Sequence, residues 1–296
     1  MPQDVAALVA RSRDGDARAV GRLISLVENG SPQLREAMAA LAPHVGQARV
    51  IGLTGSPGVG KSTTTAAMVA AYRSRGRRVG VLAVDPSSPF SGGALLGDRV
   101  RMQEHATDSG VYIRSMASRG HLGGLAWTTP QALRVLDAAG CDVVLVETVG
   151  VGQAEVEVAS LADTTLVLVA PGMGDGIQAA KAGILEIADV FVVNKADREG
   201  ADATARDLRH MLSLVEGRRA EDWQPPIVKT VASRGEGIDA LMGALDKHRD
   251  WLVESGRLDA RRRVRAADEI EAIAVTALRT RIGDLRGGTL LDELAG

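Results

Sequence analysis

Short apolar segments alternate with amphipathic ones over most of this chain. Between residues 49 and 252, a series of runs rich in β-branched residues has the length and composition of buried strands. Helical stretches such as Pro130–Ala139 and Ala201–Val215 separate most of them. The alternation predicts an α/β fold, a mostly parallel sheet with helices on both faces, whose ligands bind at the carboxyl ends of the strands. The expected strands are Val50–Thr54, Val79–Val84, Val111–Ser115, Val143–Glu147, Thr165–Ala170, Val190–Asn194 and Ile227–Val231.

Both ends of the chain have helical periodicity instead. We expect residues 1–46 to form an N-terminal helical extension, residues 47–254 the α/β domain, and residues 255–296 a C-terminal helical segment. Ser31 and Pro32 have the residue types of an N-cap followed by the first position of a helix.

The C-terminal segment combines a basic run with an apolar stripe. The run Arg261–Arg265 is interpreted as a solvated helix face. Apolar residues at helical spacing follow it, and they either pack on the core or form a dimer contact. The stripe consists of Ile270, Ile273, Ala277, Leu278, Ile282 and Leu285.

Composition excludes several classes of function. The chain has 296 residues and a formal net charge of −2, and aromatic residues make up 2% of it, so neither an electrostatic nor a stacking surface for nucleic acid is expected. The one cysteine, Cys141, is interpreted as a buried core residue in a reducing compartment. Because we find no secretory signal and no apolar run of membrane-spanning length, we expect a cytoplasmic protein without a membrane partner.

The stretch Gly55–Ser62 matches the phosphate-binding pattern G-x-x-x-x-G-K-[ST] at every fixed position. It stands between an apolar strand and a helix, which is the context that this motif needs. Backbone N–H groups and the helix N-terminus would surround phosphate oxygens. Lys61 would reach the β- and γ-phosphates, and the Ser62 hydroxyl would ligate Mg²⁺. The expected phosphate-binding residues are Gly55, Ser56, Pro57, Gly58, Val59, Gly60, Lys61, Ser62 and Thr63.

A second motif, Asn194-Lys195-Ala196-Asp197, follows an apolar strand. The Asp197 carboxylate can accept two hydrogen bonds from guanine N1–H and N2–H₂, a pair that adenine does not offer, so it would select GTP over ATP. Asn194 would tie this loop to the phosphate loop, and the stem of Lys195 would cover the base. After the last strand, the loop that begins with Val231, Ala232 and Ser233 would contact guanine O6 through a backbone N–H.

Acidic residues at other strand ends suit Mg²⁺. Glu147 ends an apolar run, and Asp85 and Asp98 are further candidate Mg²⁺ ligands in a glycine-containing segment. Gln153 could orient the attacking water, although an exposed glutamine at a helix start is an equal alternative. The predicted catalytic residues are therefore Lys61, Glu147 and Gln153, and the predicted metal ligands are Ser62, Asp85, Asp98 and Glu147.

Taken together, these motifs resemble the methylmalonyl-CoA mutase-associated GTPases, the MeaB/ArgK type within the metallochaperone group of P-loop GTPases. The resemblance extends from about residue 3 to residue 285. It rests on Gly55–Thr63, Val84–Ser88, Gly97–Met102, Val146–Gln153, Pro171–Asp175, Asn194–Asp197 and Gly235–Gly237.

The resemblance implies a cytosolic enzyme that binds GTP, GDP and Mg²⁺, hydrolyses GTP, and chaperones an adenosylcobalamin-dependent acyl-CoA mutase. In the family, GTP binding and hydrolysis gate cofactor loading and protect the mutase from inactivation. The family also forms dimers through its C-terminal region, so the resemblance implies a homodimer.

Two other functions compete with this interpretation. An ATP-dependent protein kinase linked to amino-acid transport is disfavoured by Asn194–Asp197, which point to guanine, and by the lack of an evident acceptor-positioning base. A nickel- or cobalt-insertion GTPase would need clustered histidine or cysteine ligands. The five histidines are scattered along the chain and there is one cysteine, so the sequence offers no such cluster.

Overall fold

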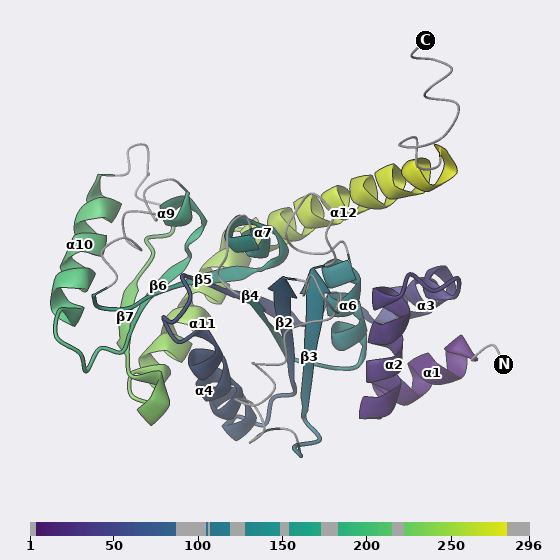
Figure 1. Ribbon diagram of the computed structural model, residues 1–296, viewed down its shortest axis with the longest axis horizontal. Coiled ribbons are helices and arrows are strands. Elements are labelled where there is room, and N and C mark those ends of the chain that lie inside the picture. Colours follow the sequence, from purple (N-terminus) through teal and green to yellow (C-terminus); the bar gives the residue numbers. More distant parts are fainter. Residues whose placement is uncertain are drawn as a thin grey trace, which may run out of the picture.

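The computed structural model describes residues 4–86, 105, 107–118, 128–148, 154–172, 183–214 and 222–282, with the backbone alone at a few of these positions, Asp85 among them. In the described residues, strands and helices alternate along the chain as the sequence predicts (Figure 1). The strands are β1 (Arg49–Thr54), β2 (Val79–Pro86), β3 (Val111–Ser118), β4 (Val143–Thr148), β5 (Thr164–Val169), β6 (Val190–Asn194) and β7 (Ile227–Thr230).

The strands form one 7-stranded sheet in the order β3-β2-β4-β1-β5-β6-β7, and every neighbouring pair is parallel. The mostly parallel α/β sheet predicted from the sequence is therefore confirmed. Because β1 is central, its carboxyl end lies between those of β4 and β5, and β6 follows next to β5. The loops after these strands meet at one edge of the sheet, where an open parallel sheet binds its ligands.

Alternate residues of each strand are buried on opposite faces of the sheet, and each face has its own helices. One face packs against α4 (Lys61–Ser74) and α11 (Ile238–Glu254) through a core that includes Leu53, Met68, Leu166, Val192 and Leu241. The other face packs against α6 (Thr128–Ala138) and α7 (Ala154–Leu161), and, over β5 and β6, against α9 (Ile184–Ile187) and α10 (Ala201–Ser213).

The N-terminal extension consists of α1 (Val5–Arg13), α2 (Ala17–Glu28), α3 (Leu34–Leu41) and the short 3-10 helix η1 (Ala42–His44), and it packs beside α6 (Figure 1). The predicted start of the third helix was two residues too early. Ser31 and Pro32 lie in the turn before α3, where the Ser31 hydroxyl accepts a hydrogen bond from the Gln33 amide at 3.3 Å. The serine caps a local turn instead of the helix, because its side chain finds a donor two residues on.

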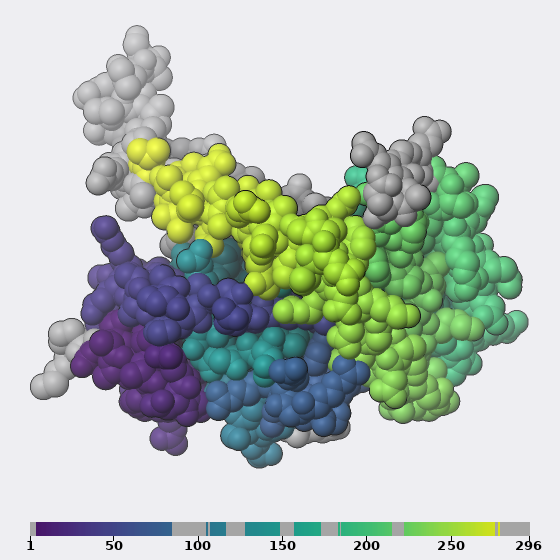
Figure 2. Space-filling model, turned by 180° about the vertical axis from the view of Figure 1, so that it is seen from behind, coloured from purple at the N-terminus to yellow at the C-terminus, as the bar shows by residue number. Residues whose placement is uncertain are grey.

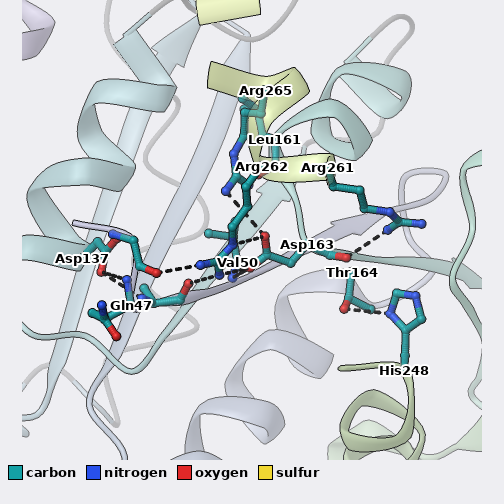
Figure 3. Close-up of polar contacts among 12 residues, drawn as sticks. Gln47, Val50, Asp137, Leu161, Asp163, Thr164, His248, Arg261, Arg262 and Arg265 are labelled. Carbon is teal, nitrogen blue, oxygen red and sulfur yellow. Dashed lines mark hydrogen bonds and ion pairs between the residues drawn. The ribbon is translucent and has the colours of Figure 1, made fainter. Parts of the chain in front are cut away.

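The C-terminal helix α12 (Arg257–Ile282) begins beside the sheet and runs along one edge of the molecule (Figures 1 and 2). The interpretation of its basic run as a solvated face was wrong for Arg261, Arg262 and Arg265, and holds for the exposed Arg263. Arg262 forms ion pairs with Asp163, at 2.8 Å to Oδ2, and donates to the carbonyl oxygens of Gly46 and Ala48 at 2.6 and 2.9 Å (Figure 3). Arg265 lies 3.5 Å from the same carboxylate. These arginines therefore anchor the helix to the domain.

Arg261 forms the second half of this anchor. Its guanidinium donates to both oxygens of Asp189 at 2.9 Å. His248, which is fully buried, places Nε2 3.2 Å from Asp189 Oδ1. Its Nδ1 is hydrogen-bonded to Thr164 Oγ1 at 2.9 Å (Figure 3). These contacts join α12, α11 and the amino ends of β5 and β6 into one polar network.

The two aspartates remain ionised despite their burial. Burial alone would raise the pKa of Asp163, but hydrogen bonding and charge from Arg262 outweigh it and hold that pKa below its ordinary value of 3.8. Burial acts in the same direction on the pKa of Asp189, and His248 and Arg261 reverse it. Asp163 and Asp189 stand directly before β5 and β6. The network therefore holds the amino ends of these strands in place, and the ligand-binding edge lies at their carboxyl ends.

The apolar stripe on α12 does not pack on the core in this structure. Ile270, Ile273 and Leu278 are 66%, 44% and 57% exposed, so of the two alternatives left by the sequence, core packing is wrong for these residues. Arg134 of α6 forms an ion pair with Glu269 at 2.7 Å, which holds the middle of the helix to the domain. The exposed side chains therefore lie on a helix whose position is fixed.

Candidate nucleotide-binding site

The phosphate loop connects β1 to α4 at the centre of the sheet edge. Gly60 is the N-cap of α4 and has a φ of 98°, and a Cβ atom there would overlap the Asn194 side-chain amide, so the position needs glycine in both respects. Lys61 is buried, and its Nζ donates to the carbonyl oxygens of Gly55 and Ser56 at 2.6 and 3.2 Å. These contacts hold a cation inside the loop, at the N-terminus of a helix, where an anion is favoured.

A buried acid lies behind the phosphate loop. Glu147 is 3% exposed and stands at the end of β4, paired in register with Leu53 of β1. The Ser62 hydroxyl donates to Glu147 Oε1 at 2.7 Å, and Thr65 Oγ1 lies 3.0 Å from Oε2. Mg²⁺ prefers oxygen ligands such as a hydroxyl and a carboxylate, so Ser62 and Glu147 fit that ion.

The remaining metal and catalytic candidates are described in part or not at all. Asp85 follows Val84, which is paired with Thr148 of β4, so its backbone lies at the same sheet edge as Glu147; its side chain is outside the description. Asp98 and Gln153 lie outside the described residues. Their predicted roles remain predictions.

Asn194 at the end of β6 connects three segments. Its Nδ2 donates to the carbonyl oxygen of Val59 in the phosphate loop at 2.9 Å. Its Oδ1 accepts from the Thr230 hydroxyl and from the Ala232 amide, both at 3.1 Å. Since Asn194 is buried, these bonds are shielded from water and fix the spacing between the phosphate loop and the loop after β7.

Two further residues of this motif, Lys195 and Asp197, contact the neighbouring loops. Lys195 adopts a φ of 57°, in the left-handed region, and its Nζ donates to the carbonyl oxygen of Gly58 at 2.6 Å. Asp197 is about a third exposed and accepts a hydrogen bond from Arg234 Nη2 at 2.9 Å. Arg234 belongs to the short 3-10 helix η4 (Ala232–Arg234), directly after Val231.

The structure thus brings most of the predicted residues to one edge of the sheet. The phosphate loop, Glu147, the Asn194–Asp197 loop and the Val231–Ser233 loop all lie at the carboxyl ends of β1, β4, β6 and β7. Lys61 supplies a cation in the phosphate loop, Ser62 and Glu147 supply buried oxygen ligands, and Asp197 supplies a carboxylate at the surface. Together these groups can hold a nucleoside triphosphate with Mg²⁺.

Sequence reasoning missed three side chains of this arrangement. Thr65 stands three residues after Ser62, on the same side of α4, and that spacing was a usable signal. Thr230 and Arg234 reach Asn194 and Asp197 from a strand and loop more than thirty residues away, and no local pattern marks them.

Other candidate chemistry is limited within the described part of the chain. Burial raises the pKa of the Cys141 thiol to about 12, so it is a core residue, as the sequence predicted, and no nucleophile at neutral pH. Among the described residues, no group of three or more His, Cys, Asp or Glu side chains is placed to hold a metal ion. Nor does any helix in that part of the chain have the length and apolar character to cross a membrane.

Fold and site together define a P-loop GTPase: a parallel sheet carrying a phosphate loop, a buried serine–glutamate pair and an Asn-Lys-x-Asp loop. The family model described as "Methylmalonyl Co-A mutase-associated GTPase MeaB" matches residues 20–284. The chain belongs to this family, and the enzymatic activity of the class is GTP hydrolysis.

Individual relatives agree with this assignment. A Pyrococcus abyssi protein whose name describes a GTPase is 52% identical over 267 residues, which cover 90% of this chain and 82% of the relative. "GTPase ArgK" of Escherichia coli is 38% identical, over 84% of this chain and 77% of its own. The mouse protein "Methylmalonic aciduria type A homolog, mitochondrial" is 40% identical, over 72% of this chain and 52% of its own.

Solved structures show the same fold. The crystal structure titled "LAO/AO transport system kinase" has a TM-score of 0.77 at 29% identity, and the match covers 94% of this chain and 86% of that one. HypB from Helicobacter pylori has a TM-score of 0.52 at 16% identity, covering 74% of this chain and 93% of that one, and this likeness concerns the fold alone.

Proposed function

We propose that this GTPase acts as a chaperone for an adenosylcobalamin-dependent acyl-CoA mutase, gating the loading of its cofactor and protecting it from inactivation. The observation that carries the proposal is the family assignment, whose description names methylmalonyl-CoA mutase. The phosphate loop and the Asn194–Asp197 loop, which lie at the same edge of the sheet, support it. The name of the mouse relative, which refers to methylmalonic aciduria, supports the same connection.

The proposed chemistry divides among the residues already described. Lys61 binds the β- and γ-phosphates, and Asp197 reads guanine N1–H and N2–H₂. Ser62 and Glu147 would hold Mg²⁺, which supplies charge stabilisation to the transferring phosphoryl group. Asp85 and Asp98 are proposed as further ligands of that ion, and Gln153 as the residue that orients the attacking water.

The loops after β6 and β7 would bind the base. With nucleotide bound, the stem of Lys195 would cover one face of the ring, and a backbone N–H from residues 231–233 would meet guanine O6. The Ala232 amide donates to Asn194 at 3.1 Å, which holds this loop in position.

The chain organisation supports a role in assembly. We assign residues 1–46 as an N-terminal helical extension, 47–254 as the GTPase domain and 255–296 as a C-terminal segment that dimerises in the cytoplasm. Its exposed apolar residues, Val264, Ile270, Ile273 and Leu278, support a homodimer because such side chains lose contact with water when a second copy covers them.

Kinase and metal-insertion functions are less well supported. One structural relative carries a transport-kinase title, but the exposed Asp197 carboxylate favours guanine over adenine. The described residues hold no cluster of metal-binding side chains such as metal insertion requires.

The experiment is an inactivation assay on an adenosylcobalamin-dependent acyl-CoA mutase. The mutase is allowed to turn over with this protein and Mg·GTP, with this protein and no nucleotide, or with the Lys61→Ala variant and Mg·GTP. We expect the half-life of mutase activity to lengthen only with the wild-type protein and GTP. An unchanged half-life in every arm, with the purified protein hydrolysing GTP normally, would contradict the chaperone role and leave the GTPase assignment intact.

A further inference from the structure

We infer that Arg234 is a positioning residue that sets the guanine specificity of this site by holding the Asp197 carboxylate. The inference rests on the proposed role of Asp197 as the reader of the base. It concerns a residue outside both sequence motifs, on the loop that follows β7.

The contact uses one side of the carboxylate. Arg234 Nη2 lies 2.9 Å from Asp197 Oδ2, whereas its Nη1 lies 3.5 Å from Glu236 Oε1. The guanidinium therefore does not form the two-pronged pair that would occupy both oxygens of Asp197. A carboxylate has about four acceptor sites, so Oδ1 and the second lone pair of Oδ2 remain able to accept from a guanine edge while Arg234 stays in place.

The backbone of Arg234 is held by hydrogen bonds, although its side chain is 58% exposed. The Arg234 amide donates to the Val231 carbonyl at 2.9 Å, and Val231 and Glu236 form a bridge that closes the loop. The neighbouring Ala232 amide is bound to Asn194, which also holds the phosphate loop. Arg234 thus extends from a segment whose distance to Asp197 is fixed.

A carboxylate that reads two donors must present both oxygens in the plane of the base. An unrestrained Asp side chain rotates about two bonds, and each productive hydrogen bond then costs conformational entropy. Arg234 restricts that rotation before the base arrives. Its effect should be greatest for guanine, which uses both oxygens, and smaller for hypoxanthine, which lacks the N2 amine.

The test measures the dissociation constants of GDP and IDP, two nucleotides that differ in that amine alone, and reports their ratio. Wild-type protein should prefer GDP. In Arg234→Ala the preference should fall about two- to fivefold, as expected for an exposed charged pair, while IDP affinity changes less. Arg234→Lys keeps the positive charge but loses the planar guanidinium that contacts Asp197 and Glu236. Its preference for GDP should therefore lie between those of the wild type and Arg234→Ala.

Arg198→Ala is the matched control, because it removes the same charge one residue from Asp197. Among the described residues, the exposed Arg198 side chain forms no hydrogen bond or ion pair. It should leave the GDP-to-IDP preference unchanged. Thermal melting of every variant checks that folding is intact, as expected for exposed positions.

A fourth variant, Asp197→Asn, separates the proposed role of Asp197 from that of Arg234. If it leaves the preference unchanged, Asp197 does not read the base, and both the assignment and the inference fail. If it abolishes the preference while Arg234→Ala does not alter it, the role of Arg234 alone is overturned. A tighter GDP affinity in Arg234→Ala would also overturn it, because Arg234 would then compete with the base.

Discussion

Removal of Arg262 tests whether the basic run of α12 is an anchor. Its guanidinium donates to both oxygens of Asp163, at 3.2 and 2.8 Å, and to two backbone carbonyls. Asp163 is 2% exposed, so the Arg262→Ala variant leaves a buried carboxylate without its main partner. Removing one partner of a buried pair destabilises the fold by more than the pair contributed, because the remaining charge stays desolvated.

The magnitude follows from what remains around Asp163. Breaking a fully buried pair costs about 3–5 kcal/mol. Arg262 is 21% exposed, Arg265 stays 3.5 Å from Asp163, and the Val50 amide still donates to it at 3.0 Å. We therefore expect the free energy of unfolding to fall by about 2–3 kcal/mol, less than for a fully buried pair. For a domain of this size the melting temperature should fall by roughly 5–10 °C.

Thermal melts and urea titrations followed by circular dichroism measure this change. The matched control is Arg263→Ala, because Arg263 is exposed and its side chain donates one turn back to the Asp259 carbonyl. That variant should stay within about 0.5 kcal/mol of wild type. Arg262→Ala combined with Asp163→Asn should be less destabilised than the two single changes added together. Coincident melting curves for Arg262→Ala and Arg263→Ala would show that Arg262 does not anchor α12.

Further predictions concern the site and its pH dependence. Lys61→Ala should lower GTP turnover by about a hundredfold or more in a phosphate-release assay, because a phosphate-binding cation is lost. Glu147→Gln should raise the Mg²⁺ concentration for half-maximal turnover by roughly tenfold. Gly60→Ala should weaken GDP binding in calorimetry more than Gly58→Ala, since a Cβ at Gly60 would meet Asn194 and one at Gly58 meets nothing within 4 Å. The lowered pKa values of Asp163 and Asp189 stabilise the fold above the ordinary aspartate pKa of 3.8. This stability should be lost as the pH falls from about 4 through the folded values, which melting temperatures across that range would show.

The sheet could be predicted from the sequence because its signals are local. Each strand is a short apolar run, and the observed bounds of β6, Val190–Asn194, are those predicted. The phosphate loop and the Asn194–Asp197 motif likewise need a fixed spacing that is readable in one dimension. The structure adds their spatial relation, above all the bond between Asn194 and the Val59 carbonyl.

The features missed depend on distant partners. Arg262 looks like a solvated arginine until Asp163, ninety-nine positions earlier, is placed against it. Arg234 meets Asp197 only because β6 and β7 are neighbours in the sheet. The apolar stripe of α12 had helical spacing, which does not reveal what covers it. In each case the local residue type was compatible with several environments, and the fold selected one.

The most direct test of the account is Mg²⁺-dependent hydrolysis of GTP and of ATP by the purified protein, with and without an adenosylcobalamin-dependent acyl-CoA mutase. We predict turnover of GTP but not of ATP, and a higher rate when the mutase is present. Hydrolysis of ATP at an equal or greater rate would contradict the assignment of Asp197 as the reader of guanine. It would also favour the kinase function that we have ranked lower.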